Sequence, residues 1–355
     1  MSEVVVIGGG QAGLATAYFL RRANMPYVVL DAEDGAGGAW RHAWDSLRLF
    51  SPAAWSSIPG RPMTQTSEPY PARDDVIAYL SEYEQRYEIP VERPVLVERV
   101  ERAERGFRVC ASDGRQWDAR AVVSATGTWR KPFSPDYPGL DTYEGVQLHS
   151  AHYRSAEPFS GKRVGVIGGG NSAAQIFTEL DLVAEATWMT LTPPSFLPDD
   201  VDGRVLFQRA TERWRAEQEN RKPDIPVGGF GDIVMVPSVK AARERGSLIA
   251  LPTPASFTRS GVTWDDGSDS EFDVVVWCTG FKPALEHLQP LQIVKPDGRV
   301  DMDETRYRCS SIPGLWLLGY GDWTGAASAT LVGVTRSARE VVRQLSDYVA
   351  AVPGK

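Results

Sequence analysis

The sequence contains little cysteine and little histidine. Its 355 residues include three cysteines and four histidines. The cysteines form no C-x-x-C pair and no spacing typical of a zinc site, so we predict no metal centre. The lack of a cysteine pair also excludes a dithiol-based disulfide reductase. So few cysteines fit a reducing compartment, and we expect a cytoplasmic location.

Long apolar runs and an excess of positive charge are also missing. No apolar stretch approaches the ~18 residues that would cross a bilayer. No basic segment precedes the strand-like run that starts at Glu3, so a signal peptide is not expected. Lys and Arg number 38 against 46 Asp and Glu, a net charge of −8. We therefore expect neither a membrane nor a nucleic acid as the main partner.

Glycine, in contrast, is abundant and clustered. The sequence has 33 glycines, against the roughly 25 that an average usage of about 7% would give. The clusters lie at residues 8–13, 35–38 and 168–170. Such clusters favour tight turns and close approach of the backbone to a ligand. The length of the chain predicts about two domains.

The first glycine cluster lies between a predicted strand and a predicted helix. Residues 4–7 are apolar and mostly β-branched, and residues 14–22 have helical periodicity. Between them stands Gly8-Gly9-Gly10-Gln11-Ala12-Gly13, and Asp31 follows a second strand 18 residues past Gly13. This is the dinucleotide-binding fingerprint in its required context. It predicts a pyrophosphate at the helix N-terminus and a ribose at the carboxylate.

The same pattern recurs in the second half of the chain. Residues 163–167 form a predicted strand, followed by Gly168-Gly169-Gly170-Asn171-Ser172-Ala173 and a helix to about Leu182. Alanine at the third glycine position is compatible with the fingerprint. The chain is therefore expected to bind two dinucleotides.

A second repeat supports internal duplication. Asp113-Gly114 and Asp266-Gly267 each predict the turn of a β-hairpin. The first hairpin leads to Ala125-Thr126-Gly127 and the second to Cys278-Thr279-Gly280. The matching order and spacing favour two copies of one structural plan.

Over its whole length the chain resembles the flavin-containing monooxygenases, class B flavoprotein monooxygenases, and among them the short bacterial type. Besides the two glycine loops, the resemblance rests on residues 143–153, Tyr-Glu-Gly-Val-Gln-Leu-His-Ser-Ala-His-Tyr. These match the family pattern F-x-G-x-x-x-H-x-x-x-(Y/F), with Tyr143 in place of Phe. Baeyer–Villiger monooxygenases have Trp at the last position, so Tyr153 favours the flavin-containing branch.

The resemblance implies an α/β fold with two Rossmann-like dinucleotide-binding domains, the second inserted in the first. Residues 1–150 and 281–355 are expected to form a discontinuous FAD-binding domain. Residues 151–280 are expected to form the NAD(P)H-binding domain, with an insertion at about residues 193–254. Residues 131–159 are interpreted as a linker, in which His149 is expected to be a structural anchor. A helix is expected from Ala326 to the end.

The resemblance also implies which residues bind the cofactors. Asp322 is expected near the ribityl and phosphate part of the flavin. The expected FAD set is Gly8, Gly10, Gln11, Ala12, Gly13, Asp31, Gly38, Trp40, His42, Thr126, Gly127 and Asp322. The expected NAD(P)H set is Gly168, Gly170, Asn171, Ser172, Leu191 and Thr192.

The activity implied by the resemblance is an FAD-dependent monooxygenation. Such an enzyme uses NADPH or NADH and O2 to oxygenate a small-molecule substrate, a sulfide or an amine, through a C4a-hydroperoxyflavin. The same chemistry extends to Baeyer–Villiger oxidation of ketones. The cofactor carries the reaction, while the protein positions it and excludes water. The family further implies a homodimer. One alternative stays open, a flavin-binding NAD(P)H oxidase or redox sensor without oxygen transfer.

Two positions depart from the larger family members. Phe50 stands where those members have an Asn near flavin C4a, and Phe offers no hydrogen bond. We therefore expect a short-lived oxygenating species and leakage to peroxide. At the expected 2′-position of the second loop stand Leu191 and Thr192, neither the Arg of NADPH-selective members nor an acid. Use of both coenzymes follows, unless Arg204 of the insertion supplies the missing charge.

Overall fold

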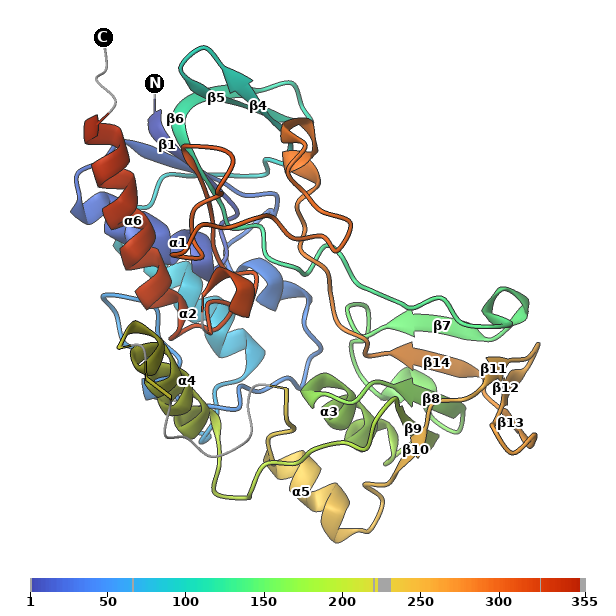
Figure 1. Ribbon diagram of the computed structural model, residues 1–355. Helices are drawn as coiled ribbons and strands as arrows, with labels where there is room; N and C mark the ends of the chain where they lie inside the picture. The colour runs from blue at the N-terminus through green and yellow to red at the C-terminus, as the bar shows by residue number, and fades with distance from the viewer. Residues whose placement is uncertain (1, 66, 220, 223–230, 326, 352–355) are drawn as a thin grey trace. The chain divides into compact units, whose positions relative to one another are not determined.

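Two sheets built largely of parallel strands, each with its own helices, organise the chain (Figure 1). The computed structural model describes residues 2–65, 67–219, 221–222, 231–325 and 327–351. The chain divides into two units. The first unit comprises Met1–Arg41, Ser51–Lys131 and Lys282–Lys355, and the second comprises His42–Phe50 and Pro132–Phe281. As expected, the second unit is inserted into the sequence of the first.

The sheet of the first unit has the order β3-β2-β1-β6-β5-β4, with β15 paired to β6. Its parallel strands are β1 (Ser2–Ile7), β2 (Tyr27–Leu30), β3 (Val91–Glu92), β6 (Gln116–Ser124) and β15 (Leu315–Leu317), and its antiparallel strands are β4 (Val97–Ala103) and β5 (Gly106–Ala111). Its helices are α1 (Gln11–Arg22), α2 (Arg73–Arg86) and α6 (Val334–Ala351). Val4, Val5 and Val6 of β1 are fully buried, as expected for a parallel strand covered on both faces.

The sheet of the second unit is parallel throughout and has the order β10-β9-β8-β14-β7. Its strands are β7 (Val146–His149), β8 (Arg163–Ile167), β9 (Glu185–Thr190), β10 (Ala250–Pro252) and β14 (Val274–Trp277). Its helices are α3 (Asn171–Leu180), α4 (Gly203–Gln218) and α5 (Pro237–Glu244). A small antiparallel sheet contains β11 (Ser256–Phe257), β12 (Gly261–Thr263) and β13 (Asp269–Glu271).

Each unit uses a glycine where its strand turns into its helix. Gly8, with φ +108°, lies so close to the end of β6 that a Cβ there would collide with the carbonyl oxygen of Ala125. Gly168, with φ +147°, lies in the same way against the carbonyl oxygen of Cys278 after β14. A side chain at either position would meet both steric overlap and an unfavourable backbone conformation.

The two Thr-Gly turns also repeat in detail. The Thr126 hydroxyl donates to the Ala284 carbonyl (2.7 Å), and the Gly127 carbonyl accepts from the Ala284 amide (3.0 Å). In the second unit the Thr279 hydroxyl donates to the Phe133 carbonyl. The Gly280 carbonyl accepts from the Phe133 amide (3.0 Å). The repeat predicted from the sequence is therefore confirmed at the level of hydrogen bonds.

The hairpin predictions are also confirmed. Asp113-Gly114 lies in the turn between β5 and β6, and Asp266-Gly267 lies in the turn between β12 and β13.

Among the described residues, no helix is long and apolar enough to cross a bilayer.

The interpretation of residues 131–159 as a linker was wrong. Within them β7 pairs in parallel with β14 along four residues and forms an edge of the second sheet. The second unit consequently takes in the chain from Pro132 on, earlier than the expected boundary at 150. It also includes His42–Phe50, because Trp44, 6% exposed, packs in the core of this unit with Val164 and Val166.

Two further expectations differ from the structure. The C-terminal helix begins at Val334, because residues 327–333 form turns in which the Thr330 hydroxyl accepts from the Gly333 amide. Ala326 and residues 352–355 lie outside the described residues. The inserted segment of the second unit ends before residue 250, because β10 belongs to the main sheet through its pairing with β9.

Substitution of Gly13 tests the packing between β1 and α1. A Cβ at Gly13 would overlap the carbonyl oxygen of Gly8, so we expect Gly13→Ala to lower the free energy of unfolding by at least about 2 kcal/mol. Gly114→Ala is the matched control, because Gly114 has φ +86° but no atom within 4 Å of the added Cβ. The Gly114→Ala variant should lose only about 1 kcal/mol of unfolding free energy. Equal losses in urea unfolding would contradict the steric explanation.

Candidate functional site

The N-terminus of α1 is open to an anion. Its N-cap is Gly10, no side chain caps the helix, and its first turn contains no acidic residue. A Cβ added to Gly10 would meet nothing closer than the Gly38 Cα at 3.9 Å. The amides of the first helical turn and the helix dipole therefore favour an anion at this end of the helix.

Asp31 follows β2 and lies beside the first glycine loop, where a Cβ added to Gly9 would be 2.6 Å from its Oδ2. It is 5% exposed, and its Oδ2 accepts from Nε of Arg93 at 2.7 Å. Arg93 in turn donates to both carboxylate oxygens of Glu84, at 2.6 and 2.8 Å. The ion pair neutralises a buried charge and fixes the orientation of the Asp31 carboxylate. This arrangement is suited to a ribose hydroxyl.

Arg93 was missed by the sequence reasoning, although a signal existed. It directly follows β3, which pairs in parallel with β2. Since the carboxyl ends of parallel strands meet at one edge of a sheet, residues after β3 come close to Asp31 after β2.

Gln11 joins two of the predicted flavin-contacting segments to the segment that follows Asp322. Its Nε2 donates to the Ala329 carbonyl (2.7 Å), and its Oε1 accepts from Nε1 of Trp40 (3.1 Å). Gly38, with φ +54°, lies close enough to the first loop that an added Cβ would be 2.8 Å from the Gly10 Cα. The first loop, the Gly38–Trp40 turn and residue 329 are thus brought together. His42 belongs to the second unit, where its carbonyl accepts from Arg154.

Thr126 is held by a buried hydroxyl network. The Tyr320 hydroxyl lies 2.7 Å from the Thr126 Oγ1, 3.1 Å from the Thr126 amide and 2.6 Å from the Ser124 Oγ. Nε2 of His287, in the 3₁₀ turn Glu286–Leu291, lies 2.9 Å from the same Ser124 Oγ. Ser124, Tyr320 and His287 are all 5% exposed or less.

The direction of each hydrogen bond follows from the last acceptor, the Ala284 carbonyl, which cannot donate. Thr126 donates to it, so Thr126 Oγ1 accepts from the Tyr320 hydroxyl. Tyr320 then accepts from Ser124, and Ser124 accepts from Nε2–H of His287. His287 is thereby assigned the neutral Nε2–H tautomer, consistent with burial, which lowers its pKa to about 4.

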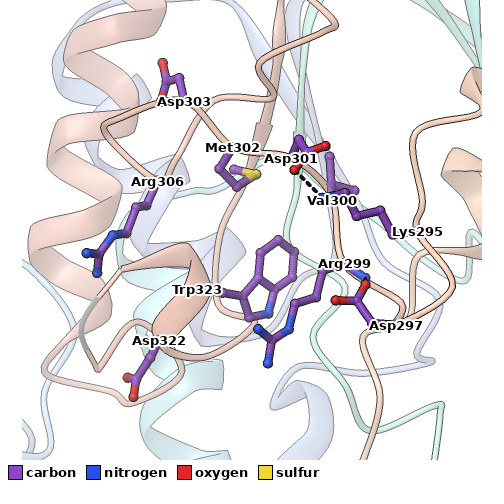
Figure 2. A pocket seen from close by; sticks show the side chains of 10 residues that line it. All are labelled: Lys295, Asp297, Arg299, Val300, Asp301, Met302, Asp303, Arg306, Asp322 and Trp323. Atoms are coloured by element: carbon purple, nitrogen blue, oxygen red, sulfur yellow. Dashed lines mark hydrogen bonds and ion pairs between the residues drawn. The ribbon is translucent and has the colours of Figure 1, made fainter.

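Asp322 lies in a pocket of about 380 Å³ in the first unit (Figure 2). The indole of Trp323 and the thioether of Met302 line it together with charged side chains of both signs. Asp322 is exposed, and the preceding Tyr320 links its turn to Thr126. The sequence-predicted residues Thr126 and Asp322 are therefore connected through one side chain.

The second glycine loop offers a similar open helix N-terminus. Gly170 is the N-cap of α3, no side chain caps the helix, and an added Cβ would have no atom within 4 Å. This end of α3 therefore also favours an anion. The Asn171 side chain is occupied within the protein, since it donates to the Asp232 carbonyl (3.0 Å) and accepts from the Val234 amide (2.8 Å).

The expected 2′-position of the second loop carries no charge. Leu191 is 85% exposed, and Thr192 is also exposed. Nε of Arg204 lies 3.0 Å from both carboxylate oxygens of Asp202. Arg204 is thus engaged in an ion pair within the inserted segment.

Phe50 and His149 are both part of the second unit. The Phe50 ring packs against the ring of Phe207 on α4, with centroids 6.3 Å apart, and the Phe50 carbonyl accepts from the Gly203 amide (2.8 Å). Nδ1 of His149 accepts from the Ala151 amide (3.1 Å), so its Nε2–H donates to the Gly280 carbonyl (3.0 Å). Burial lowers the pKa of His149. Its contacts are those of the anchor that the sequence predicted.

Several known proteins and one family model match half of this chain or more. A family model described as pyridine nucleotide-disulphide oxidoreductase matches residues 5–192. A solved flavin-containing monooxygenase from Stenotrophomonas maltophilia is 56% identical, with a TM-score of 0.90 and coverage of 98% of each chain. An uncharacterized CzcO-like oxidoreductase from Geobacillus kaustophilus is 27% identical over 98% of this chain and 99% of its own. The indole-3-pyruvate monooxygenase YUCCA1 from Oryza sativa is 27% identical, covering 78% and 76%.

The buried His287 predicts a pH dependence of stability. The unfolded chain binds a proton on this imidazole below about pH 6.5, whereas the folded protein does so only near pH 4. Protons bound by the unfolded chain alone favour unfolding, so stability is lost as pH falls from about 6.5 to 4. The full loss from this group should be on the order of 3 kcal/mol.

We expect His287→Gln to show a shallower loss, since a Gln amide can still donate to Ser124 but does not titrate. Free energies of unfolding in urea at pH 7, 6 and 5 measure both slopes. Parallel slopes in the two proteins would show that His287 does not carry the effect.

Proposed function

This chain belongs to the pyridine nucleotide-disulphide oxidoreductase family and is an NAD(P)H-dependent flavin monooxygenase, and we propose that it oxygenates soft nucleophiles, sulfides and amines, with either NADH or NADPH. FAD and NAD(P)H are its cofactors. Two equivalent glycine loops support this proposal most strongly. Each leads into a helix whose N-terminus no side chain caps. Two dinucleotides in one chain are what transfer of hydride from a nicotinamide to a flavin requires.

We assign FAD to the first unit and NAD(P)H to the second. The Asp31 carboxylate, held by Arg93, would bind the FAD ribose, and the amides that follow Gly10 would bind its pyrophosphate. In the second unit, the amides that follow Gly170 would bind the pyrophosphate of NAD(P)H. Ketone oxidation, a cytoplasmic location and a homodimer remain part of the proposal through the family resemblance.

The chain's own residues are proposed to bind and position, without supplying a nucleophile. A flavin held by the first loop and Asp31 would supply hydride acceptance and O2 activation. Cys110, Cys278 and Cys309 are free, and burial raises the pKa of Cys278 to about 12. Dithiol chemistry is therefore not available, despite the name of the family. Both ring nitrogens of His149 are hydrogen-bonded to backbone groups.

Use of both coenzymes follows from the uncharged surroundings of the expected 2′-position. A hydrogen bond to a charged group contributes about 1.5–3 kcal/mol, and neither Leu191 nor Thr192 offers one. Arg204 is paired with Asp202, so we do not expect it to favour NADPH strongly over NADH by binding the 2′-phosphate.

A second candidate is an NAD(P)H oxidase or redox sensor that releases peroxide. The observation that favours it is Phe50, whose ring packs on Phe207 and provides no hydrogen-bond donor. Without such a donor, an activated oxygen species decays sooner.

The purified protein should be yellow and should oxidise both NADH and NADPH. We expect the two kcat/KM values to lie within about a hundredfold, because the lost charge contact corresponds to roughly 10- to 100-fold in affinity. With methyl phenyl sulfide present, the sulfoxide should form, which chromatography detects. Peroxide as the sole product would instead support the oxidase or sensor.

Replacement of Phe50 separates the two candidates further. Phe50→Asn restores a donor and should raise the sulfoxide formed per NADPH consumed, while the peroxide fraction falls. Phe50→Leu is the matched control, because it also changes the ring but adds no donor. Peroxide yields that are the same in Phe50→Asn and the original protein would contradict the role assigned to this position.

A further inference from the structure

The hydroxyl network around Tyr320 is an addition to the first Thr-Gly turn. The second turn makes the same backbone contacts through Thr279 and Gly280. At the position of Ser124, however, it has Trp277, whose indole donates to Gln147. The fold can therefore build this turn without a buried chain of hydroxyls, and the network serves something specific to the first unit.

Burying this network is costly unless every member is satisfied. Ser124 is fully buried, and Tyr320 and His287 are nearly so. Apolar side chains of similar shape would avoid the desolvation of these polar groups. Each donor of the chain nevertheless finds an acceptor, ending at the Ala284 carbonyl. A satisfied network of this kind fixes one arrangement of the segments it joins.

The same tyrosine also begins the turn that carries Asp322. The Tyr320 amide donates to the Thr324 Oγ1 (3.1 Å). The hydroxyls of Thr324 and Ser328 both donate to the Gly321 carbonyl, at 3.0 and 2.9 Å. The backbone of Tyr320 thus belongs to the Asp322 turn, while its hydroxyl is bonded to Thr126.

We propose that Tyr320 is a positioning residue for FAD, which locks the Thr126-Gly127 turn and the Asp322 turn into one binding arrangement. This inference rests on the proposed assignment of FAD to the first unit. Loss of the hydroxyl removes the acceptor of the Thr126 amide and of Ser124 together. The two turns then move independently, and FAD must order them on binding.

Tyr320→Phe tests this role by removing one oxygen atom. We expect the Kd for FAD, from titration of the FAD-free protein, to rise roughly tenfold, because the Thr126 amide and the buried Ser124 hydroxyl both lose their acceptor. Binding of NADP⁺ in the second unit should stay within twofold. The absorption spectrum of the bound flavin should also change.

Tyr143→Phe is the matched control. Tyr143 is 7% exposed, and its hydroxyl donates to the Phe272 carbonyl (2.9 Å) in the second unit. It should lose stability in urea as Tyr320→Phe does, but keep the original Kd for FAD. An unchanged Kd for FAD in Tyr320→Phe, or an equal rise of this Kd in both variants, would overturn the proposal. Failure of the unsubstituted protein to bind FAD would instead refute the proposed function.

Ser124→Ala provides a second test if Tyr320→Phe does not fold. It removes one link of the network and leaves the contact between Tyr320 and Thr126 in place. A smaller rise in the Kd for FAD supports the positioning role, and an unchanged Kd contradicts it.

Discussion

The structure depends on the close approach of each glycine loop to the end of a neighbouring strand. Gly8 lies against the carbonyl of Ala125, and Gly168 lies against the carbonyl of Cys278, where no Cβ fits. This approach lets the strand turn directly into a helix whose first amides stay open. It also sets the Thr-Gly turn that follows beside the loop. The open helix N-terminus and its neighbouring turn therefore arise from one steric constraint, used twice in the chain.

The two copies have diverged in their polar groups. The first adds an ion pair between Asp31 and Arg93 and a buried chain of hydroxyls through Tyr320. In the second copy, the Asn171 side chain is hydrogen-bonded to the inserted segment, and Leu191 is exposed to solvent. A dinucleotide that stays bound through many turnovers fits the more constrained copy. A coenzyme that exchanges at each turnover fits the more open one.

Local patterns were predictable from the sequence, and distant contacts were not. Glycine loops, Asp-Gly hairpins and the carboxylate after the second strand are encoded within short windows, so they were identified correctly. Arg93 and Tyr320 act through partners 62 and 196 residues away. Such contacts depend on which strands pair, as β2 and β3 do beside Arg93, and not on a local pattern. Strand β7 was missed because four residues in a proline-rich stretch show little periodicity, and only the pairing with β14 defines them.

The central claim is that the first loop binds FAD and the second binds NAD(P)H. The variants Gly10→Ala and Gly170→Ala test it most directly, because both positions are equivalent and have room for a Cβ. Gly10→Ala should fold and lose most of its bound FAD while still binding NADP⁺. Gly170→Ala should stay yellow, but NADPH should reduce its flavin only at much higher coenzyme concentration. If Gly170→Ala loses FAD and Gly10→Ala retains it, the assignment of the two units is wrong.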